Sequence, residues 1–203
     1  MEIKVNYQNS ILINNKIYVD PLKVGGEVKA QYIFITHPHW DHFSIEDIKK
    51  ILTSKTIIVC PQTMKADIEN LFNNEIVYVE PNQNYEIGDI VVKTVSSYNI
   101  NKQFHKKENN WVGYVLSVNG ETVMIVGDSD NTPELNQVKT DILLVPIGGT
   151  YTMNHMEAAE LVNSIKPKIV IPTHYGNIVG DKNMGNEFKK LILPEIVCEL
   201  QLK

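Results

Sequence analysis

Four potential metal ligands stand within the six-residue run His37–His42, which reads His-Pro-His-Trp-Asp-His. Neutral imidazole and carboxylate groups are the side chains that bind zinc, iron or manganese. Side chains on extended backbone point to alternate faces, so His37, His39 and Asp41 would face one side. His42 would face the other. One loop can therefore offer ligands to two neighbouring metal ions. Four ligand-type side chains within six residues favour a metal site over an ordinary polar surface loop.

Two later segments place comparable side chains at the ends of predicted strands. Asp128 follows the apolar run 123–126, and His174 follows the apolar run 169–172. Each residue taken alone is equally typical of a turn. The run at 37–42 follows the apolar segment 32–36 in the same way, so three strand ends carry ligand-type side chains. A carboxylate such as Asp128 has two oxygens and could bridge two ions.

Strand and helix patterns alternate along the chain, in two halves of similar order. Helix starts are indicated by Ser44 as an N-cap and by Pro61 before the next apolar period. Asn119-Gly120 is a strong hairpin signal. The pattern predicts strands at 3–7, 11–13, 17–19, 31–36, 56–60, 76–79, 90–95, 112–118, 122–126, 141–145 and 168–171, and helices at 45–52, 62–71, 156–165 and 186–193. We therefore expect an α/β fold whose two halves pack with sheets inside and helices outside.

Length and composition indicate one globular domain over residues 1–203, with 43% hydrophobic residues and a net charge of −5. The chain has no arginine, the usual bidentate reader of phosphate and guanine, which counts against a nucleic-acid partner. Cys60 and Cys198 lie in apolar runs and read as buried reduced thiols. The sequence shows neither a signal-peptide pattern nor an apolar run of membrane-spanning length, so we expect a cytoplasmic protein. Its oligomeric state is left open.

The order His-x-His-x-Asp-His, Gly-Asp and His resembles the metallo-β-lactamase fold superfamily, and the resemblance covers essentially the whole chain. Within it, the chain resembles the compact metal-dependent hydrolases related to ascorbate-6-phosphate lactonase. The segments that carry this finer resemblance are 97–99, 148–153 and 172–176. The resemblance implies a four-layer αββα sandwich with a metal site between the two sheets.

The resemblance also implies a binuclear ligand set. The first metal would be held by His37 and His39, and Asp128 would bridge the two ions. The second metal would be held by Asp41, His42 and His174.

One departure concerns the third histidine of the first site, because Asn99 stands where relatives carry it. His105 is the imidazole nearby, and it could supply the missing ligand or face the substrate. Because the fourth ligand of the first metal is not assigned, we predict that the first site binds its ion more weakly than the second. Zinc is the expected metal, although His and carboxylate sites also accept manganese and iron.

A metal-bound hydroxide could act as the nucleophile of a hydrolase whose sequence shows no obvious serine or cysteine nucleophile. A dication lowers the pKa of bound water to about 7, which supplies hydroxide at neutral pH. The sequence has no Gly-x-Ser-x-Gly run, and neither cysteine adjoins a motif histidine. We therefore expect a metal-dependent hydrolase that uses metal-bound hydroxide on an ester, lactone, amide or phosphodiester bond of a small molecule. Asp41, as a proton shuttle, and Asp128 are the candidate catalytic carboxylates.

Alternatives from other classes stay open. A phosphodiesterase or nuclease of the same fold shares the motif but would need a basic surface. A redox di-iron protein would need electron partners. A non-catalytic metal-binding protein on this scaffold is favoured by the departure around Asn99.

Other side chains have weaker assignments. Asp20, before a proline, is expected to support a ligand or form a turn. Trp40 and Trp111 are expected to be packing residues, although Trp40, which lies within the motif, could also form a pocket wall. His155 is expected at an exposed helix start. Three tyrosines are candidate donors to a substrate oxygen or packing residues: Tyr98, Tyr151 and Tyr175.

Overall fold

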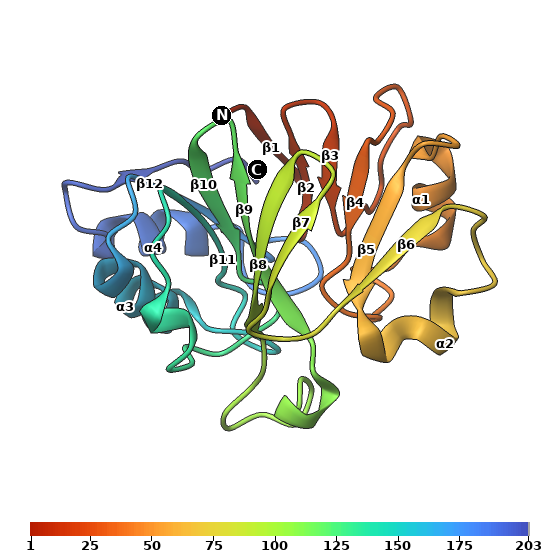
Figure 1. The fold of residues 1–203 in the computed structure, drawn as a ribbon. Helices are drawn as coiled ribbons and strands as arrows, with labels where there is room; N and C mark the ends of the chain where they lie inside the picture. The colour runs from red at the N-terminus through yellow and green to blue at the C-terminus, as the bar shows by residue number, and fades with distance from the viewer. Residues whose placement is uncertain (203) are drawn as a thin grey trace.

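Two β-sheets lie face to face, with helices on their outer sides (Figure 1). The computed structural model describes residues 1–202. Strands β1 to β6 form the first sheet in chain order, and β3 to β6 are parallel to one another. These strands are β1 (Ile3–Tyr7), β2 (Ser10–Ile13), β3 (Ile17–Val19), β4 (Tyr32–Phe34), β5 (Ile57–Pro61) and β6 (Glu75–Val79).

The second sheet contains seven strands in the order β13-β12-β11-β10-β9-β8-β7. Neighbouring strands are parallel from β10 to β13 and antiparallel from β7 to β10. These strands are β7 (Asn84–Ile87), β8 (Ile90–Ser96), β9 (Val112–Val118), β10 (Glu121–Ile125), β11 (Ile142–Pro146), β12 (Ile169–Thr173) and β13 (Val197–Cys198).

Helices cover the outer face of each sheet. The first sheet carries α1 (Ile45–Ile51) and α2 (Lys65–Ile68), and the second carries α3 (His155–Ile165) and α4 (Met184–Leu191). The side chain of Ser44 accepts a hydrogen bond at the start of α1, and Asn154 forms a capping box with Glu157 at α3. Residues 1–202 also contain three short 3₁₀ helices: η1 (Gln62–Met64), η2 (Lys107–Asn109) and η3 (Leu135–Gln137).

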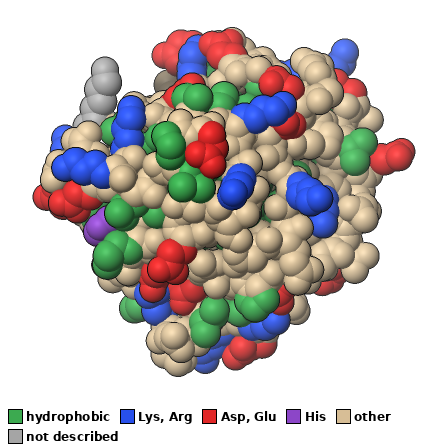
Figure 2. All heavy atoms as spheres, turned by 90° about the vertical axis from the view of Figure 1, so that its left-hand side faces the viewer, with side chains coloured by type: hydrophobic (Ala, Val, Ile, Leu, Met, Phe, Trp, Pro, Cys, Tyr) green, Lys and Arg blue, Asp and Glu red, His purple; other side chains and the backbone are tan. Residues whose placement is uncertain are grey.

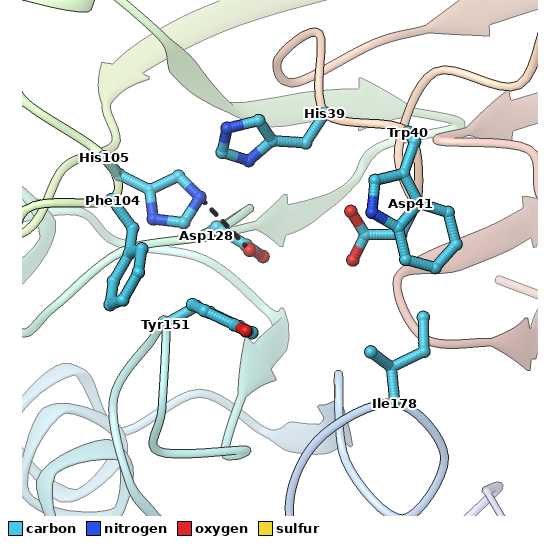
Figure 3. A pocket seen from close by; sticks show the side chains of 8 residues that line it. All are labelled: His39, Trp40, Asp41, Phe104, His105, Asp128, Tyr151 and Ile178. Atoms are coloured by element: carbon cyan, nitrogen blue, oxygen red, sulfur yellow. Dashed lines mark ion pairs between the residues drawn. The ribbon is translucent and has the colours of Figure 1, made fainter.

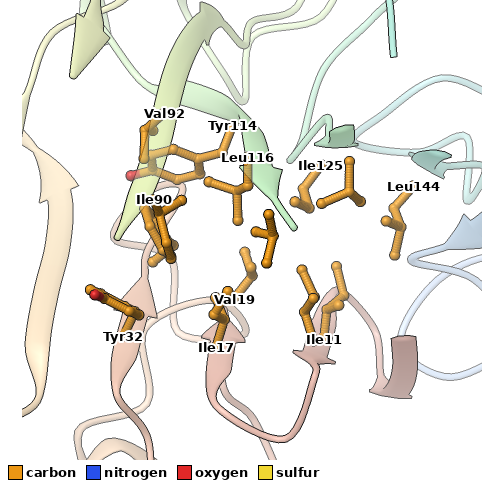
Figure 4. Close-up of a cluster of buried hydrophobic side chains, with 14 of the residues drawn as sticks. Ile11, Ile17, Val19, Tyr32, Ile90, Val92, Tyr114, Leu116, Ile125 and Leu144 are labelled. Carbon is orange, nitrogen blue, oxygen red and sulfur yellow. The ribbon is translucent and has the colours of Figure 1, made fainter. Parts of the chain in front are cut away.

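Three apolar cores correspond to the three interfaces between the four layers. The central core packs side chains such as Ile17 of the first sheet against Tyr114 and Leu116 of the second (Figure 4). A second core lies between the second sheet and α3 and α4, and a third lies between the first sheet and α1 and α2. Burial of apolar surface at these interfaces stabilises the arrangement. The predicted αββα sandwich is thus confirmed.

The elements differ from the sequence prediction in a few places. The predicted helix at 62–71 is a 3₁₀ turn followed by a single α-helical turn, and α4 begins two residues before the predicted 186. Strands β7 and β13 were not predicted. The exposed Asn84 and Glu86 give β7 no apolar run, so its conformation depends on pairing with β8.

The strand ends that carry the candidate ligands meet at one edge of the sandwich. Strand β4 leads into the run 37–42, β10 leads to Asp128, and β12 leads to His174. The segment 97–111 between β8 and β9 projects at the same edge, at the bottom of Figure 1. Loops at strand ends can hold functional side chains on a rigid scaffold, so this edge is where the site is built. Among the described residues, no helix is long and apolar enough to span a bilayer.

Candidate metal centre

The run at 37–42 forms a tight turn directly after β4. The backbone N–H groups of His42 and Phe43 both donate to the carbonyl of His39, at 2.9 and 2.8 Å. His37 and His42 are buried, whereas Trp40 is 68% exposed. The turn therefore directs its histidines inward and its tryptophan outward.

The first group of candidate ligands consists of His37, His39 and His105, whose ligand atoms lie within 4.8 Å of one another. His105 comes from the segment between β8 and β9, and its backbone N–H and Nδ1 both contact Asn99 Oδ1, at 3.0 and 3.1 Å. This contact holds Nδ1 in the N–H form and turns Nε2 toward the other two histidines. Trp111 packs on all three rings, with centroids 4.9 to 5.6 Å away.

The geometry bears on the departure at Asn99. Asn99 Oδ1 contacts His105, and His105, not Asn99, lies in the group with His37 and His39. A ligand role for His105 would give both groups three side chains besides Asp128, which would remove the reason for expecting a weaker first site.

The second group consists of Asp41, His42 and His174. Asp41 Oδ2 lies 3.4 Å from His174 Nε2 and 3.7 Å from His42 Nε2. His174 is fully buried just after β12, and its backbone N–H donates to Gln8 O at 3.0 Å. The backbone of His174 is left-handed, with φ of 56°. Such a conformation is uncommon for a non-glycine residue and recurs at functional sites.

Asp128 lies between the two groups and contacts both. Its Oδ1 is 3.3 Å from His42 Nε2, and its Oδ2 is 3.3 Å from His174 Nε2 and 3.4 Å from His105 Nε2. Gly127 precedes it with φ of 70°, and a Cβ there would lie 3.3 Å from Ser97 Oγ and from Thr36 side-chain atoms. Burial raises the pKa of Asp128, but the charges of His174 and His42 outweigh it and hold that pKa well below its ordinary value.

Asp20 contacts the candidate ligand His42, in line with the first of the two roles expected for it. It is buried at the end of β3, and its Oδ2 contacts His42 Nδ1 at 2.8 Å. It also accepts from the backbone N–H of Thr36 at 2.8 Å, from Thr36 Oγ1 at 2.7 Å and from Asn9 Nδ2 at 2.8 Å. Burial lowers the pKa of His42, yet Asp128 and Asp20 together raise it well above its ordinary value. Asp20 also leaves Nε2 of His42 directed at the candidate site.

The donor set fits a transition-metal ion. Within residues 1–202, the buried polar atoms without a hydrogen-bond partner include Nε2 of His42, His105 and His174, and Oδ1 of Asp128. Buried polar groups are ordinarily hydrogen-bonded, so several such atoms converging on one place indicate a ligand. Imidazole nitrogens with carboxylate oxygens are the donors that zinc, manganese and iron accept.

A pocket of about 220 Å³ opens onto the candidate ligands (Figure 3). It is lined by His39, Trp40, Asp41, Phe104, His105, Asp128, Tyr151 and Ile178. Trp40 is exposed and lines the pocket, so the packing role expected for it is wrong and the wall position is the one observed. Phe104 and Ile178 were not anticipated, since single apolar residues in irregular segments give no periodic signal.

Among the other residues singled out from the sequence, only Tyr151 lines the pocket. The hydroxyl of Tyr98 donates to Glu134 at 2.9 Å, and that of Tyr175 faces the carbonyl of Leu202. Both are packing residues, which leaves Tyr151 at the pocket. His155 lies in the first turn of α3, partly exposed, with Nε2 3.7 Å from Glu187. Cys60 and Cys198 are free and buried, and burial raises the pKa of Cys60 to about 12.

Comparison with known proteins shows the superfamily and the family of the chain. Residues 7–174 match the family model described as the Beta-lactamase superfamily domain, so the chain belongs to the β-lactamase superfamily with its metallo-β-lactamase fold. More narrowly, it belongs to the UPF0173 family. It is 31% identical to a UPF0173 protein of Pyrococcus furiosus over 182 residues, which cover 89% of this chain and 80% of that protein.

Two further similarities extend over nearly the whole chain. The UPF0173 metal-dependent hydrolase of Archaeoglobus fulgidus is 26% identical, with coverage of 87% of this chain and 83% of that protein. A crystal structure of a Parabacteroides distasonis protein superposes with a TM-score of 0.86 at 26% identity, covering 99% of this chain and 93% of the other.

Proposed function

We propose that the protein hydrolyses an ester, lactone, amide or phosphodiester bond of a small molecule, with two divalent ions, preferably zinc, at the candidate centre. The chain is a metal-dependent hydrolase of this superfamily, because it matches the family model and its relatives are named metal-dependent hydrolases. The observation that carries the finer proposal is the convergence of seven ligand-type side chains beside a pocket. They are His37, His39, Asp41, His42, His105, Asp128 and His174.

The seven side chains would hold two ions in two groups. Bound divalent ions would lower the pKa of coordinated water and polarise the oxygen of the bond to be cleaved. His37, His39 and His105 would hold one ion, and Asp41, His42 and His174 the other, while Asp128 spans both groups. All of these side chains except His39 and Asp41 are buried, so they are held in place before substrate arrives.

Asp41 is the proposed proton carrier. It lines the pocket, and its Oδ2 faces His174 Nε2 at 3.4 Å. This leaves Oδ1 to accept the proton of the attacking water and to pass it to the leaving group. Burial raises the pKa of Asp41, but hydrogen bonding to His174 and the charge of His42 outweigh burial and hold that pKa below its ordinary value. The carboxylate is therefore ionised at neutral pH.

Turnover by the metal-loaded protein tests this function. The protein would be reconstituted with zinc, manganese or iron, the ions counted, and hydrolysis measured on a panel of esters, lactones, amides and phosphodiesters. We expect Asp41→Asn to lower kcat by about 10²-fold or more. The exposed Asp67→Asn on α2 is the matched control and should leave kcat unchanged. A fully loaded protein that hydrolyses none of these bonds would contradict the proposal.

The alternatives have less support. A non-catalytic role was favoured by the departure at Asn99, and the position of His105 within 4.8 Å of the ligand atoms of His37 and His39 argues against it. A nucleic-acid substrate would require a continuous basic surface. On the face that carries α3 and α4, lysines and acidic side chains are interspersed (Figure 2).

A further inference from the structure

Apolar side chains form the outer wall of the pocket beside the candidate metal centre. Trp40 is 68% exposed, Phe104 48% and Ile178 36%, and Tyr151 stands beside them. Of the eight large hydrophobic side chains exposed among residues 1–202, three therefore line this one pocket. Exposed apolar residues normally occur singly, and their gathering around a concave site marks a binding surface.

The wall is assembled from four separate segments, and two of its side chains contact each other. Trp40 belongs to the turn after β4, Phe104 to the β8–β9 segment, Tyr151 to the β11–α3 loop and Ile178 to the β12–α4 loop. The rings of Phe104 and Tyr151 meet edge to face at 4.7 Å. Asn99 Nδ2 donates to the carbonyl of Tyr151 at 2.9 Å, so the residue that positions His105 also anchors this wall.

No lysine is among the residues that line the pocket, and the chain has no arginine. The histidines and carboxylates in the lining all belong to the candidate metal centre. Two lysines of the β8–β9 segment are paired, Lys102 with Asp130 and Lys107 with Glu134, and Lys106 does not line the pocket. A charged substituent packed against the apolar wall, away from the candidate centre, would find no lysine or arginine there to replace its hydration.

We propose that the substrate is a neutral ester, lactone or amide whose small apolar substituent packs among Trp40, Phe104, Tyr151 and Ile178. This inference rests on the proposed function and narrows its substrate class to compounds whose substituent at the wall carries no charge. For an ester, the oxygen of water bonds to the acyl carbon, and the acyl carbon–oxygen bond breaks. The leaving alcohol takes the proton. The pocket of about 220 Å³ admits one ring or a short chain.

Matched p-nitrophenyl esters test the substituent, since the leaving group stays constant. From acetate to hexanoate, kcat/KM should rise about fourfold per added methylene until the pocket is full, mainly through KM. The p-nitrophenyl monoester of succinic acid should be poorer than the butyrate, which has the same chain length without the charge. A flat series, or a preference for the charged ester, would overturn the inference.

Variants assign the effect to the wall. Ile178→Ser should flatten the chain-length series, and Trp40→Leu should do the same while the metal content stays that of the wild type. Val91→Ser is the matched control, because Val91 is 52% exposed on β8 and does not line the pocket. An unchanged series in both pocket variants would contradict the assignment.

Binding without hydrolysis separates this inference from the proposed function. Calorimetry on the metal-loaded protein would compare N-methylhexanamide with N-methylacetamide, which share one neutral amide and differ in chain length. We expect the longer amide to bind at least tenfold more tightly, and Ile178→Ser to remove the difference. If this holds while no ester is hydrolysed, the apolar subsite stands and the proposed reaction fails. If esters are hydrolysed but neither series discriminates, the reaction stands and the subsite is wrong.

Discussion

Asp128 is the side chain on which both ligand groups converge. Its two oxygens lie 3.3 to 3.4 Å from Nε2 of His42, His105 and His174, and it is only 4% exposed. We predict that Asp128→Ala lowers the metal content from two ions to one or none and abolishes hydrolysis. Metal counting by mass spectrometry checks this, with exposed Asp181→Ala as the control. Full occupancy in Asp128→Ala would show that the carboxylate does not bridge the ions.

Asn99 controls the orientation of one imidazole. Its Oδ1 accepts from both the backbone N–H and the Nδ1–H of His105. We predict that Asn99→Ala weakens binding of the ion at the first group by about 10- to 100-fold, as loss of a group that orients a ligand does elsewhere. Competition with a chromophoric chelator measures this affinity.

A neighbouring residue provides the comparison for that change. Asn101 is exposed in the same segment, so Asn101→Ala should bind metal like the wild type. Equal affinities in the Asn99 and Asn101 variants would show that His105 is either self-oriented or not a ligand.

At the scale of elements, hydrogen bonds of Asp20 link the ends of β3 and β4 beside the candidate site. Asp20 follows β3, and it binds the Thr36 backbone beyond β4 and the His42 ring at 2.8 Å each. Asn9, in the turn between β1 and β2, donates to the same carboxylate. Three segments of the first sheet are thereby held together at the edge where the ligands stand.

We predict that Asp20→Ala lowers the free energy of unfolding by about 3 kcal/mol, because it leaves buried donors unsatisfied around a removed charge. Urea unfolding of the metal-free protein measures this without a contribution from bound ions. Asp67→Ala, at an exposed site on α2, should change stability by less than about 0.5 kcal/mol. A similarly small effect at Asp20 would show that water replaces the carboxylate in this network.

At the scale of the whole molecule, the sandwich does not rely on metal for its fold. The three cores bury apolar side chains from nearly every strand and helix, and a chain of 203 residues can bury enough surface to fold unaided. We predict that chelation leaves the far-ultraviolet circular dichroism spectrum unchanged. The melting temperature should fall by roughly 10 °C, since ligands that bind the folded state add a few kcal/mol of stability.

Chelation also reports on the two ions. With three side chains in each group besides Asp128, both ions should leave over a similar range of chelator concentration. His105→Ala should split this release into two steps. Unfolding on metal removal would show instead that repulsion among the empty ligands outweighs the packing of the sheets.

Much of the fold and most of the site could be predicted from local sequence. The density of ligand types at 37–42 and the apolar runs before it, before Asp128 and before His174 are properties of neighbouring residues. Strand and helix periods are local as well, which is why the αββα order was accessible. The strand β7 was missed because its polar residues are extended only through pairing with β8.

What the tertiary structure decided is which distant residues share one place. His105 and Asn99 are six residues apart in an irregular segment, and only the folded β8–β9 segment brings the ring of His105 to His37 and His39. Trp40, Phe104, Tyr151 and Ile178 come from four loops with no common pattern, yet they form one wall. Residue types and local periods fix which chemistry is available. The packing of two sheets fixes which loops meet at their shared edge, because contacts between distant segments depend on the whole core.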